Sequence, residues 1–257
     1  MALIQFEAFS DALGKAFSAQ IALPETNRAP FPVLWLLHGA CDDDSGWFRN
    51  TSVERQATRL DLAVVAPNAG MSMYEDMGNG QRYFNHIADE LPALLRRLLP
   101  LSAKREDNFI AGLSMGGMGA LKIAMRRPEQ YEAVCCLSAG HTNYRFHEPK
   151  EDTPRFNRYL IAYGEQGPLP SEEATLSRAR TLAEAGGPCP RVWHVCGEQD
   201  SLKSNAALTR DFFESLPGDP FQYEYHECPG RHNWDFWEAR VPEMLDFVLR
   251  GRKERRP

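Results

Sequence analysis

One serine of this sequence lies between two glycines, in a spacing that is typical of a catalytic nucleophile. Ser114 lies in a Gly-x-Ser-x-Gly motif at residues 112–116, between a short apolar run at 109–113 and a helix-like run at 115–125. Strand, turn and helix in this order are typical of a nucleophile elbow, whereas the bare motif also occurs in glycine-rich loops without a catalytic role. A nucleophilic serine needs a general base, an acid that orients the base, and N–H donors for the oxyanion.

Two later loops contain a candidate base and a candidate acid. His232 lies in a glycine-flanked loop after a strand-like run, and Asp200 follows the strand-like run before that one, with Glu198 as its competitor. The chain order Ser114, Asp200, His232 is the order found in α/β hydrolases and differs from the common protease orders. Two other histidines lie inside strand-like runs, where a structural role is expected: His194 and His226.

The loop after the first buried strand is the candidate for the second half of an oxyanion hole. The apolar run at 32–37 ends in His38-Gly39-Ala40, and ligands of open α/β sheets bind at the carboxyl ends of strands. We predict that the backbone N–H groups of Ala40 and Met115 are the two oxyanion donors. His38 is expected to orient this loop by hydrogen bonding. The three aspartates that follow it, at 42–44, read as a solvated loop or helix start, without convergent metal partners.

Unbroken apolar runs predict strands that are buried on both faces, as in a parallel sheet. The extended runs at 3–8 and 16–23 predict an antiparallel hairpin at the edge of that sheet. Helix-like runs alternate with the later strands, which is typical of α/β proteins. We therefore predict an α/β-hydrolase fold, with a mostly parallel central sheet flanked by helices, in a single domain over residues 1–257. The apolar runs lie at 32–37, 62–66, 109–113, 133–138 and 192–196.

The pattern changes between residues 141 and 190, where Pro, Glu, Arg and Tyr are frequent. Helix-like stretches near 153–164 and 171–185 lack a strongly apolar face. We predict a cap-like insertion over the active-site edge that helps to form the acyl or alcohol pocket. A peripheral decoration is the alternative, because surfaces tolerate long insertions. The basic segment at 251–257 is expected to be a flexible, solvated tail.

The composition excludes several classes of partner. The 257 residues are 25% charged and 43% hydrophobic, with a formal net charge of −6, which argues against nucleic acid. The N-terminus lacks a signal-peptide pattern and no apolar run approaches membrane-spanning length, so we expect a cytoplasmic protein that does not bind a membrane. The six cysteines lack metal spacing and are expected to be reduced thiols. The oligomeric state stays open, with a homo-oligomer as one alternative.

Motifs along nearly the whole chain resemble the tributyrin/acetyl esterase branch of the esterase D superfamily. That superfamily includes feruloyl and acetylxylan esterases, S-formylglutathione hydrolases and mycolyltransferases, so the resemblance implies acyl-ester chemistry without fixing one substrate. The residues that carry it are Leu36-Leu37-His38-Gly39, Trp47, Tyr74-Glu75-Asp76-Met77, Tyr83-Phe84, Glu90-Leu91-Pro92, Ala111 to Gly117, Gly197-Glu198-Gln199-Asp200 and Pro229 to Trp237.

The resemblance also implies a mechanism and a set of substrate contacts. It implies a serine carboxylesterase that hydrolyses short-chain acyl esters through an acyl-enzyme, with neither a metal nor an organic cofactor. S-formylglutathione hydrolases usually lack His-Gly at 38–39 and the Trp at 234, which favours the carboxylesterase branch. A thioesterase or acyltransferase with the same triad, and a catalytically silent binding module, are the alternatives. The implied substrate contacts are Trp47, Tyr74, Asp76 and Trp234.

The segment at 40–44, Ala40-Cys41-Asp42-Asp43-Asp44, departs from the family pattern, because many relatives carry further glycines there. We still expect the backbone N–H of Ala40 to be an oxyanion donor. The role of Cys41 stays open. Carbohydrate esterases of the superfamily are often secreted or tethered to binding modules, and neither feature occurs in this sequence. A small, diffusible ester is therefore the expected substrate.

Overall fold

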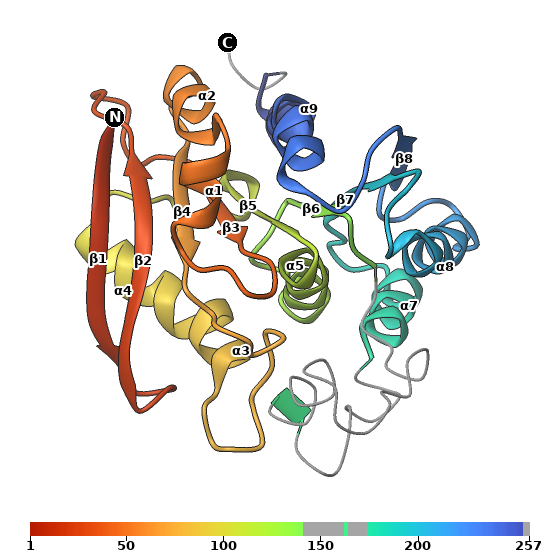
Figure 1. The fold of residues 1–257 in the computed structure, drawn as a ribbon, viewed down its shortest axis with the longest axis horizontal. Helices are drawn as coiled ribbons and strands as arrows, with labels where there is room; N and C mark the ends of the chain where they lie inside the picture. Colours follow the sequence, from red (N-terminus) through yellow and green to blue (C-terminus); the bar gives the residue numbers. More distant parts are fainter. Residues whose placement is uncertain (141–161, 164–173, 254–257) are drawn as a thin grey trace.

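The computed structural model describes residues 1–140, 162–163 and 174–253 of the chain, and its centre is one eight-stranded sheet. The strand order is β1-β2-β4-β3-β5-β6-β7-β8. The strands β3 to β8 run parallel to one another, while β2 is antiparallel to both of its neighbours (Figure 1). The strands are β1 (Ala2–Ser10), β2 (Lys15–Leu23), β3 (Val33–Leu37), β4 (Ala63–Pro67), β5 (Asn108–Leu113), β6 (Ala133–Leu137), β7 (Arg191–Gly197) and β8 (Glu224–Cys228).

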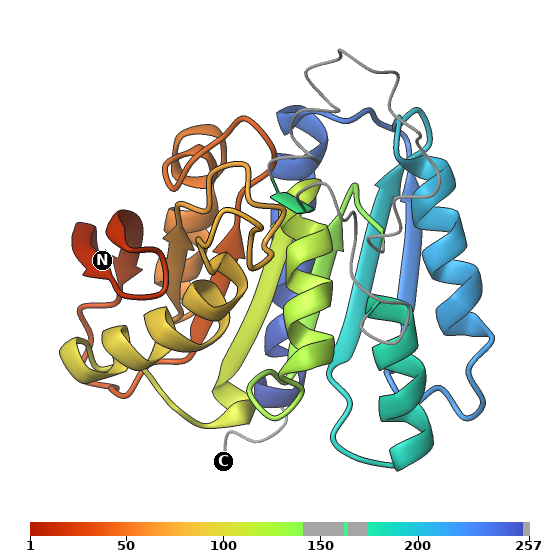
Figure 2. The ribbon, with the colours of Figure 1, turned by 90° about the horizontal axis from the view of Figure 1, so that it is seen from below.

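Helices cover both faces of the sheet, and each face has its own hydrophobic core. The larger core lies under α3 (Tyr83–Asn85), α4 (Leu91–Leu98), α5 (Met115–Arg126), α7 (Thr175–Ala185) and α8 (Lys203–Glu214), the layer seen in Figure 2. The second core lies under α1 (Gly46–Asn50), α2 (Val53–Arg59) and α9 (Trp234–Lys253). Two short helical turns complete the described elements: η1 (His86–Glu90), a π-helical turn between α3 and α4, and η2 (Arg105–Asp107), a 3-10 turn before β5.

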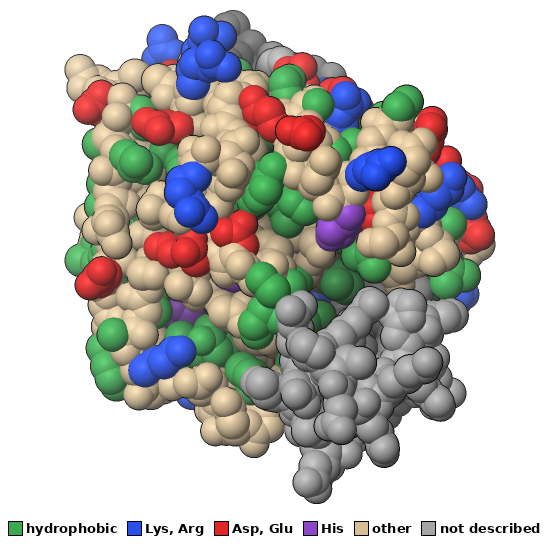
Figure 3. Space-filling model, viewed as in Figure 1, with side chains coloured by type: hydrophobic (Ala, Val, Ile, Leu, Met, Phe, Trp, Pro, Cys, Tyr) green, Lys and Arg blue, Asp and Glu red, His purple; other side chains and the backbone are tan. Residues whose placement is uncertain are grey.

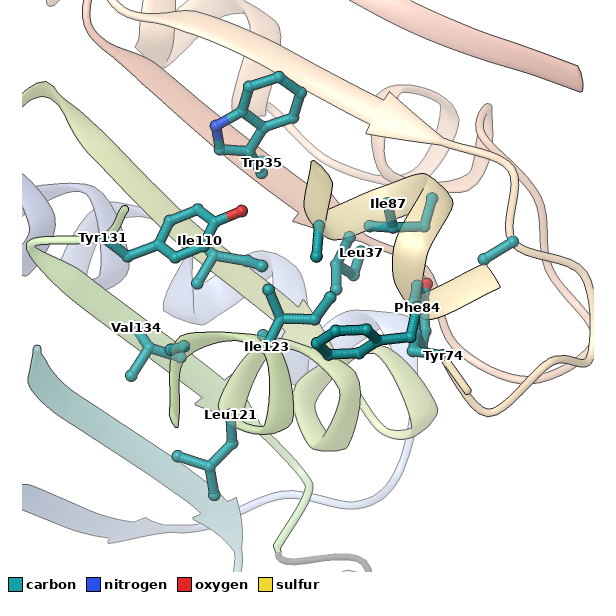
Figure 4. Close-up of a cluster of buried hydrophobic side chains, with 14 of the residues drawn as sticks. Trp35, Leu37, Tyr74, Phe84, Ile87, Ile110, Leu121, Ile123, Tyr131 and Val134 are labelled. Carbon is teal, nitrogen blue, oxygen red and sulfur yellow. The ribbon is translucent and has the colours of Figure 1, made fainter. Parts of the chain in front are cut away.

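The apolar runs of the sequence are strands because both of their faces are covered. In β3 the side chains alternate: Val33, Trp35 and Leu37 enter the larger core, and Leu34 and Leu36 enter the second. All five are buried, which is why the run shows no polar alternation. Figure 4 shows part of the larger core, where Leu37 and Ile110 of the sheet lie next to Ile123 of α5.

The structure confirms the predicted α/β-hydrolase fold, including the antiparallel hairpin made by β1 and β2. Strand β8, the strand-like run expected before His232, begins only at Glu224, because Gln222 has a left-handed φ of 44° and cannot extend the strand. The expected tail at 251–257 is partly wrong. Helix α9 continues to Lys253, and Arg252 pairs with Asp107.

The prediction of an insertion at 141–190 needs correction over its second half. Residues 174–190 contain α7, which lies beside α5 in the helix layer and places Ala179 in the larger core. The helix expected at 171–185 therefore belongs to the body of the fold. Its buried side chains are Thr175 and Ala179, and Leu176, Leu182 and Ala183 pack partly buried against the same core. The rest of the predicted insertion falls on residues outside the described ranges, apart from 162–163.

Charged side chains of both signs are interspersed on the face drawn in Figure 3. Within the described residues, no helix is both long enough and apolar enough to cross a membrane.

Candidate active site

The turn after β5 has the geometry of a nucleophile elbow. Ser114 has a left-handed φ of 51°, and its N–H donates to the Leu137 carbonyl of β6 at 2.9 Å. The two glycines allow α5 to approach the sheet closely, because a Cβ at Gly112 would lie 2.4 Å from the Gly116 backbone. A Cβ at Gly116 would lie 2.3 Å from the Leu37 carbonyl oxygen. The turn therefore holds the Ser114 side chain at the carboxyl edge of the sheet, partly exposed, at the N-terminus of α5.

The structure brings Ser114, His232 and Asp200 together. His232 lies just before α9, and its Nε2 is 2.9 Å from the Ser114 Oγ. Its Nδ1 lies 2.9 and 3.0 Å from the two carboxylate oxygens of Asp200, in the loop after β7. With a proton on Nδ1 bonded to the carboxylate, Nε2 is free to accept the serine proton. The competing acid, Glu198, is exposed and bonds Gln199 instead.

The Asp200 carboxylate is buried, with a side chain that has no solvent exposure. Burial alone would raise its pKa, but hydrogen bonds from His232, Ser138 and the Leu202 N–H outweigh burial and lower it. The Leu202 N–H lies 2.7 Å from Oδ1. The carboxylate therefore stays ionised next to the imidazole.

Ser138 and Trp237 support this carboxylate from behind. The Trp237 indole N–H donates to the Ser138 Oγ at 2.9 Å, and Ser138 in turn hydrogen-bonds Asp200. The Trp237 ring also packs edge-on against His232, with ring centroids 5.1 Å apart. These two side chains fix both the acid and the base. Ser138 directly follows β6, as Ser114 directly follows β5, and this position is the signal in the sequence that could have identified it.

Hydrogen bonds of His38 fix the loop after β3. The Ala69 N–H donates to His38 Nε2 at 2.9 Å, so the ring carries its proton on Nδ1 and donates to the Gly39 carbonyl at 2.7 Å. Burial lowers the pKa of His38, which keeps the ring neutral. A Cβ built on Gly39 would lie 3.6 Å from the Ser114 Cβ, so this loop runs directly beside the serine. The N–H groups of Ala40 and Met115 have no acceptor among the described residues.

A family model described as "Putative esterase" matches residues 10–248 of the chain. The chain belongs to this esterase family. The acetyl esterase of Caldicellulosiruptor saccharolyticus is 25% identical over 264 residues, covering 96% of this chain and 98% of that protein.

Solved structures agree with the family. The substrate-bound fluorophosphonate-binding serine hydrolase FphF of Staphylococcus aureus superposes with a TM-score of 0.85 at 27% identity. The S-formylglutathione hydrolase FrmB of the same organism superposes with a TM-score of 0.84, also at 27% identity. Each match covers 96% of this chain and 98% of the other. The predicted superfamily and its carboxylic ester hydrolase chemistry are thereby confirmed.

Two residues that the resemblance implied as substrate contacts lie behind the site of this esterase. Trp47 and Tyr74 are fully buried. The Trp47 indole N–H donates to the Leu37 carbonyl at 3.0 Å, and the Tyr74 hydroxyl donates to the His38 carbonyl at 2.9 Å. The prediction of direct contact is wrong for both, because their polar atoms orient the backbone that leads into the loop at 38–40.

The other two expected contacts differ from each other. Asp76 is exposed and accepts a hydrogen bond from the Asn85 N–H at 3.0 Å, so its carboxylate satisfies a backbone donor at the start of the helical run. Trp234 is half-buried, two residues after His232, and packs edge-on against both Trp47 and Trp237. Trp234 remains a candidate contact.

A resident metal has no candidate site in the described parts of the esterase, where no group of three His, Cys, Asp or Glu side chains converges. In the acidic loop at 42–44, Asp43 accepts hydrogen bonds from Ser45, and Asp42 lies 3.6 Å from Arg49. These carboxylates organise the loop that leads into α1. Asp44 is buried and hydrogen-bonds Ser18 of β2, so the expectation of a solvated segment at 42–44 does not hold for this residue.

Proposed function

We propose that this esterase cleaves short-chain acyl esters with Ser114 as nucleophile, His232 as general base and Asp200 as the acid that orients it. The observation that supports this most strongly is the pair of contacts made by the His232 ring: one nitrogen lies 2.9 Å from the serine oxygen and the other 2.9 Å from the carboxylate. The imidazole is therefore placed to take a proton on one side while its positive charge is stabilised on the other.

The reaction follows in two balanced steps. Ser114 Oγ attacks the ester carbonyl carbon while His232 takes its proton, and collapse of the tetrahedral intermediate returns that proton to the leaving alcohol. Water then attacks the acyl-serine while His232 takes one of its protons, and collapse of this second tetrahedral intermediate releases the acid and returns the proton to Ser114. The Ala40 and Met115 N–H groups stabilise the oxyanion in both steps, and the positive end of α5 adds to that field.

The assignment of the nucleophile is tested with p-nitrophenyl acetate and Ser114→Ala. We expect turnover to fall by at least about 10⁴-fold with the fold unchanged, because the remaining groups cannot form an acyl-enzyme. Ser177→Ala, at a helical position in α7 whose backbone carbonyl accepts from Thr181, is a matched control and should keep wild-type turnover. Turnover within a few-fold of wild type in Ser114→Ala would refute the assignment.

The preference for short acyl chains is supported by similarity to an acetyl esterase along 96% of this chain. It is tested with p-nitrophenyl esters of increasing acyl length. We expect kcat/KM to be greatest for acetate and to fall as the chain lengthens. A maximum at long chains would contradict this part of the proposal while leaving the triad assignment intact.

A thioesterase activity with the same triad is the second candidate, because the S-formylglutathione hydrolase FrmB is as similar in structure as FphF. This candidate is tested by comparing kcat/KM for S-formylglutathione with kcat/KM for p-nitrophenyl acetate. A larger value for the thioester would make the ester reaction secondary. Added alcohols that divert the acyl group from water would identify an acyltransferase instead.

A cytoplasmic location also belongs to the proposal. All six cysteines are free thiols, and Cys135, Cys136 and Cys196 are buried where they cannot exchange with a partner thiol. Reduced thiols fit a reducing compartment. Fractionation of the source cells tests this, and activity in the culture medium or a membrane fraction would contradict it.

A further inference from the structure

The outer edge of β1 lacks the features that usually keep a sheet edge from pairing. Strand β1 runs for nine residues, Ala2–Ser10, in unbroken register with β2, and no described strand lies on its other side (Figure 1). Its sequence contains no proline and no lysine, and Glu7 is its one charged side chain. Natural proteins usually protect such an edge with bulges, charges or short strands.

The opposite edge of the same sheet is protected in the usual way. Strand β8 is only five residues long and contains Glu224, His226 and Glu227. Glu224 pairs with Arg250, and Glu227 lies 2.8 Å from Lys203. The difference between the two edges therefore needs an explanation specific to β1.

Two of the four large hydrophobic side chains that are strongly exposed in the described residues lie on β1. Leu3 is 51% exposed and Phe9 is 64% exposed, on the same face of the strand as Gln5 and Glu7. The positions of Leu3 and Phe9 are symmetric about Phe6. A two-fold axis through Phe6 would therefore place each of them opposite the other in a second copy of β1.

Self-pairing about Phe6 gives every exposed side chain a suitable partner. Leu3 faces Phe9, and Gln5 faces Glu7, so an apolar pair and an amide–carboxylate pair each occur twice. An axis through Gln5 would instead place Leu3 against Glu7, and an axis through Glu7 would place two carboxylates directly opposite each other. Registers shifted by one residue would set side chains of opposite faces against each other.

We propose that the esterase forms a homodimer through antiparallel pairing of β1 with β1 of a second copy, centred on Phe6. The two sheets then join into one continuous sheet, and the free N–H and C=O groups of both edges are satisfied. Leu3 of each copy then contacts Phe9 of the other across the joined edges. The carboxyl edge that carries Ser114 is not part of this contact, so each protomer keeps a complete site.

Charge changes at Gln5 test both the dimer and its register, because Gln5 is exposed and its side chain has no partner among the described residues. Gln5→Lys creates two Lys–Glu7 pairs and should tighten dimerisation, while Gln5→Glu creates two like-charge pairs and should weaken it. Each change is expected to move the dissociation constant by roughly 2- to 30-fold. Sedimentation equilibrium on the untagged, full-length chain measures this, with a dimer expected at twice 29.1 kDa.

The controls are charge changes of the same size at exposed positions outside β1, Arg55→Gln and Glu129→Gln, which should leave the constant unchanged. Turnover of p-nitrophenyl acetate per protomer should be unchanged in all four variants. A monomer throughout the micromolar range would overturn the proposal. So would a dimer that ignores both Gln5 changes, or one that Gln5→Lys weakens, since these results place the contact elsewhere or in another register.

Discussion

Two serines of this esterase occupy almost the same backbone setting and do different work. Ser114 follows β5 and Ser138 follows β6, with left-handed φ values of 51° and 49°. Each donates its N–H to a carbonyl of the next strand, Ser114 to Leu137 at 2.9 Å and Ser138 to Val195 at 2.8 Å. The local strain often associated with a nucleophilic serine is therefore present twice.

The partners of the two hydroxyls make the difference. Ser114 is partly exposed and faces His232 Nε2, with α5 beginning at the next residue. Ser138 is fully buried, and its hydroxyl lies between the Trp237 indole N–H and the Asp200 carboxylate. A strained turn positions a serine, but only a base at hydrogen-bond distance and an open face make it a nucleophile. Both turns reach the same carboxylate, one through His232 and the other directly.

Removing the charge of that shared carboxylate should have the largest effect. Asp200→Asn keeps the size of the side chain but loses the acceptor that fixes the His232 tautomer, so we expect kcat to fall by about 10⁴-fold. Glu198→Gln, in the same loop but exposed, is the matched control and should retain wild-type kcat. If Glu198→Gln lowered kcat and Asp200→Asn did not, Asp200 would not be the carboxylate that orients His232.

A pH-dependent side chain of β7, His194, contacts the Ser138 turn. Burial lowers the pKa of His194 to about 4, and the neutral ring bonds the Ala139 carbonyl and the Tyr223 hydroxyl. Because this folded-state pKa is below the unfolded value of 6.5, the unfolded chain takes up a proton first as the pH falls. The contribution to stability is full above pH 6.5 and is lost progressively toward about pH 4.

His194→Gln removes that titration. Between pH 7 and pH 5 the free energy of unfolding of the variant should fall by roughly 2 kcal/mol less than that of the wild type. Urea denaturation at the two pH values measures the difference. An equal loss in both proteins would show that His194 does not set the acid sensitivity of this turn.

Ser138→Ala tests the supporting role directly. Asp200 loses one donor and the Trp237 N–H loses its acceptor, so we expect stability to fall by about 1–3 kcal/mol. A carboxylate held less firmly should lower kcat roughly tenfold with little change in KM. Trp237→Phe keeps the Ser138–Asp200 hydrogen bond and should cost less activity. A loss as large as that of Ser114→Ala would remove the distinction between the two serines.

The smallest effect is expected beside the Ser114 turn. Tyr74→Phe removes the hydroxyl that bonds the His38 carbonyl while keeping the packing of the ring. We expect a loss of about 1 kcal/mol in stability and a change of a few-fold in kcat/KM. An unchanged kcat with a strongly raised KM would restore Tyr74 as a substrate contact.

The sequence predicted best what depends on position along the chain. The strand runs, the elbow at 112–116 and the loops that carry Asp200 and His232 were all visible, because each lies at the end of an apolar run. The sequence did not show which side chains are exposed. Trp47 and Tyr74 were expected in the pocket but are buried, and aromatic side chains fit either role until the packing around them is known.

Contacts between distant segments could not be predicted from the sequence either. Ser138 and Trp237 are 99 residues apart and meet only because β6 and α9 pack together. Helix α7 looked like part of an insertion, since its weakly apolar face does not indicate which element it packs against. These features depend on which elements become neighbours, whereas each residue of the proposed triad follows the end of a single strand.

The most direct test is to locate a covalent adduct. The esterase is treated with a fluorophosphonate, digested, and the modified residue is identified by mass spectrometry. We expect one adduct per chain, on Ser114. In Asp200→Asn, where the reaction is slowed, we expect no adduct. An adduct on Ser138 or on another residue, or no adduct in an enzyme that still cleaves p-nitrophenyl acetate, would contradict the assignment of the nucleophile.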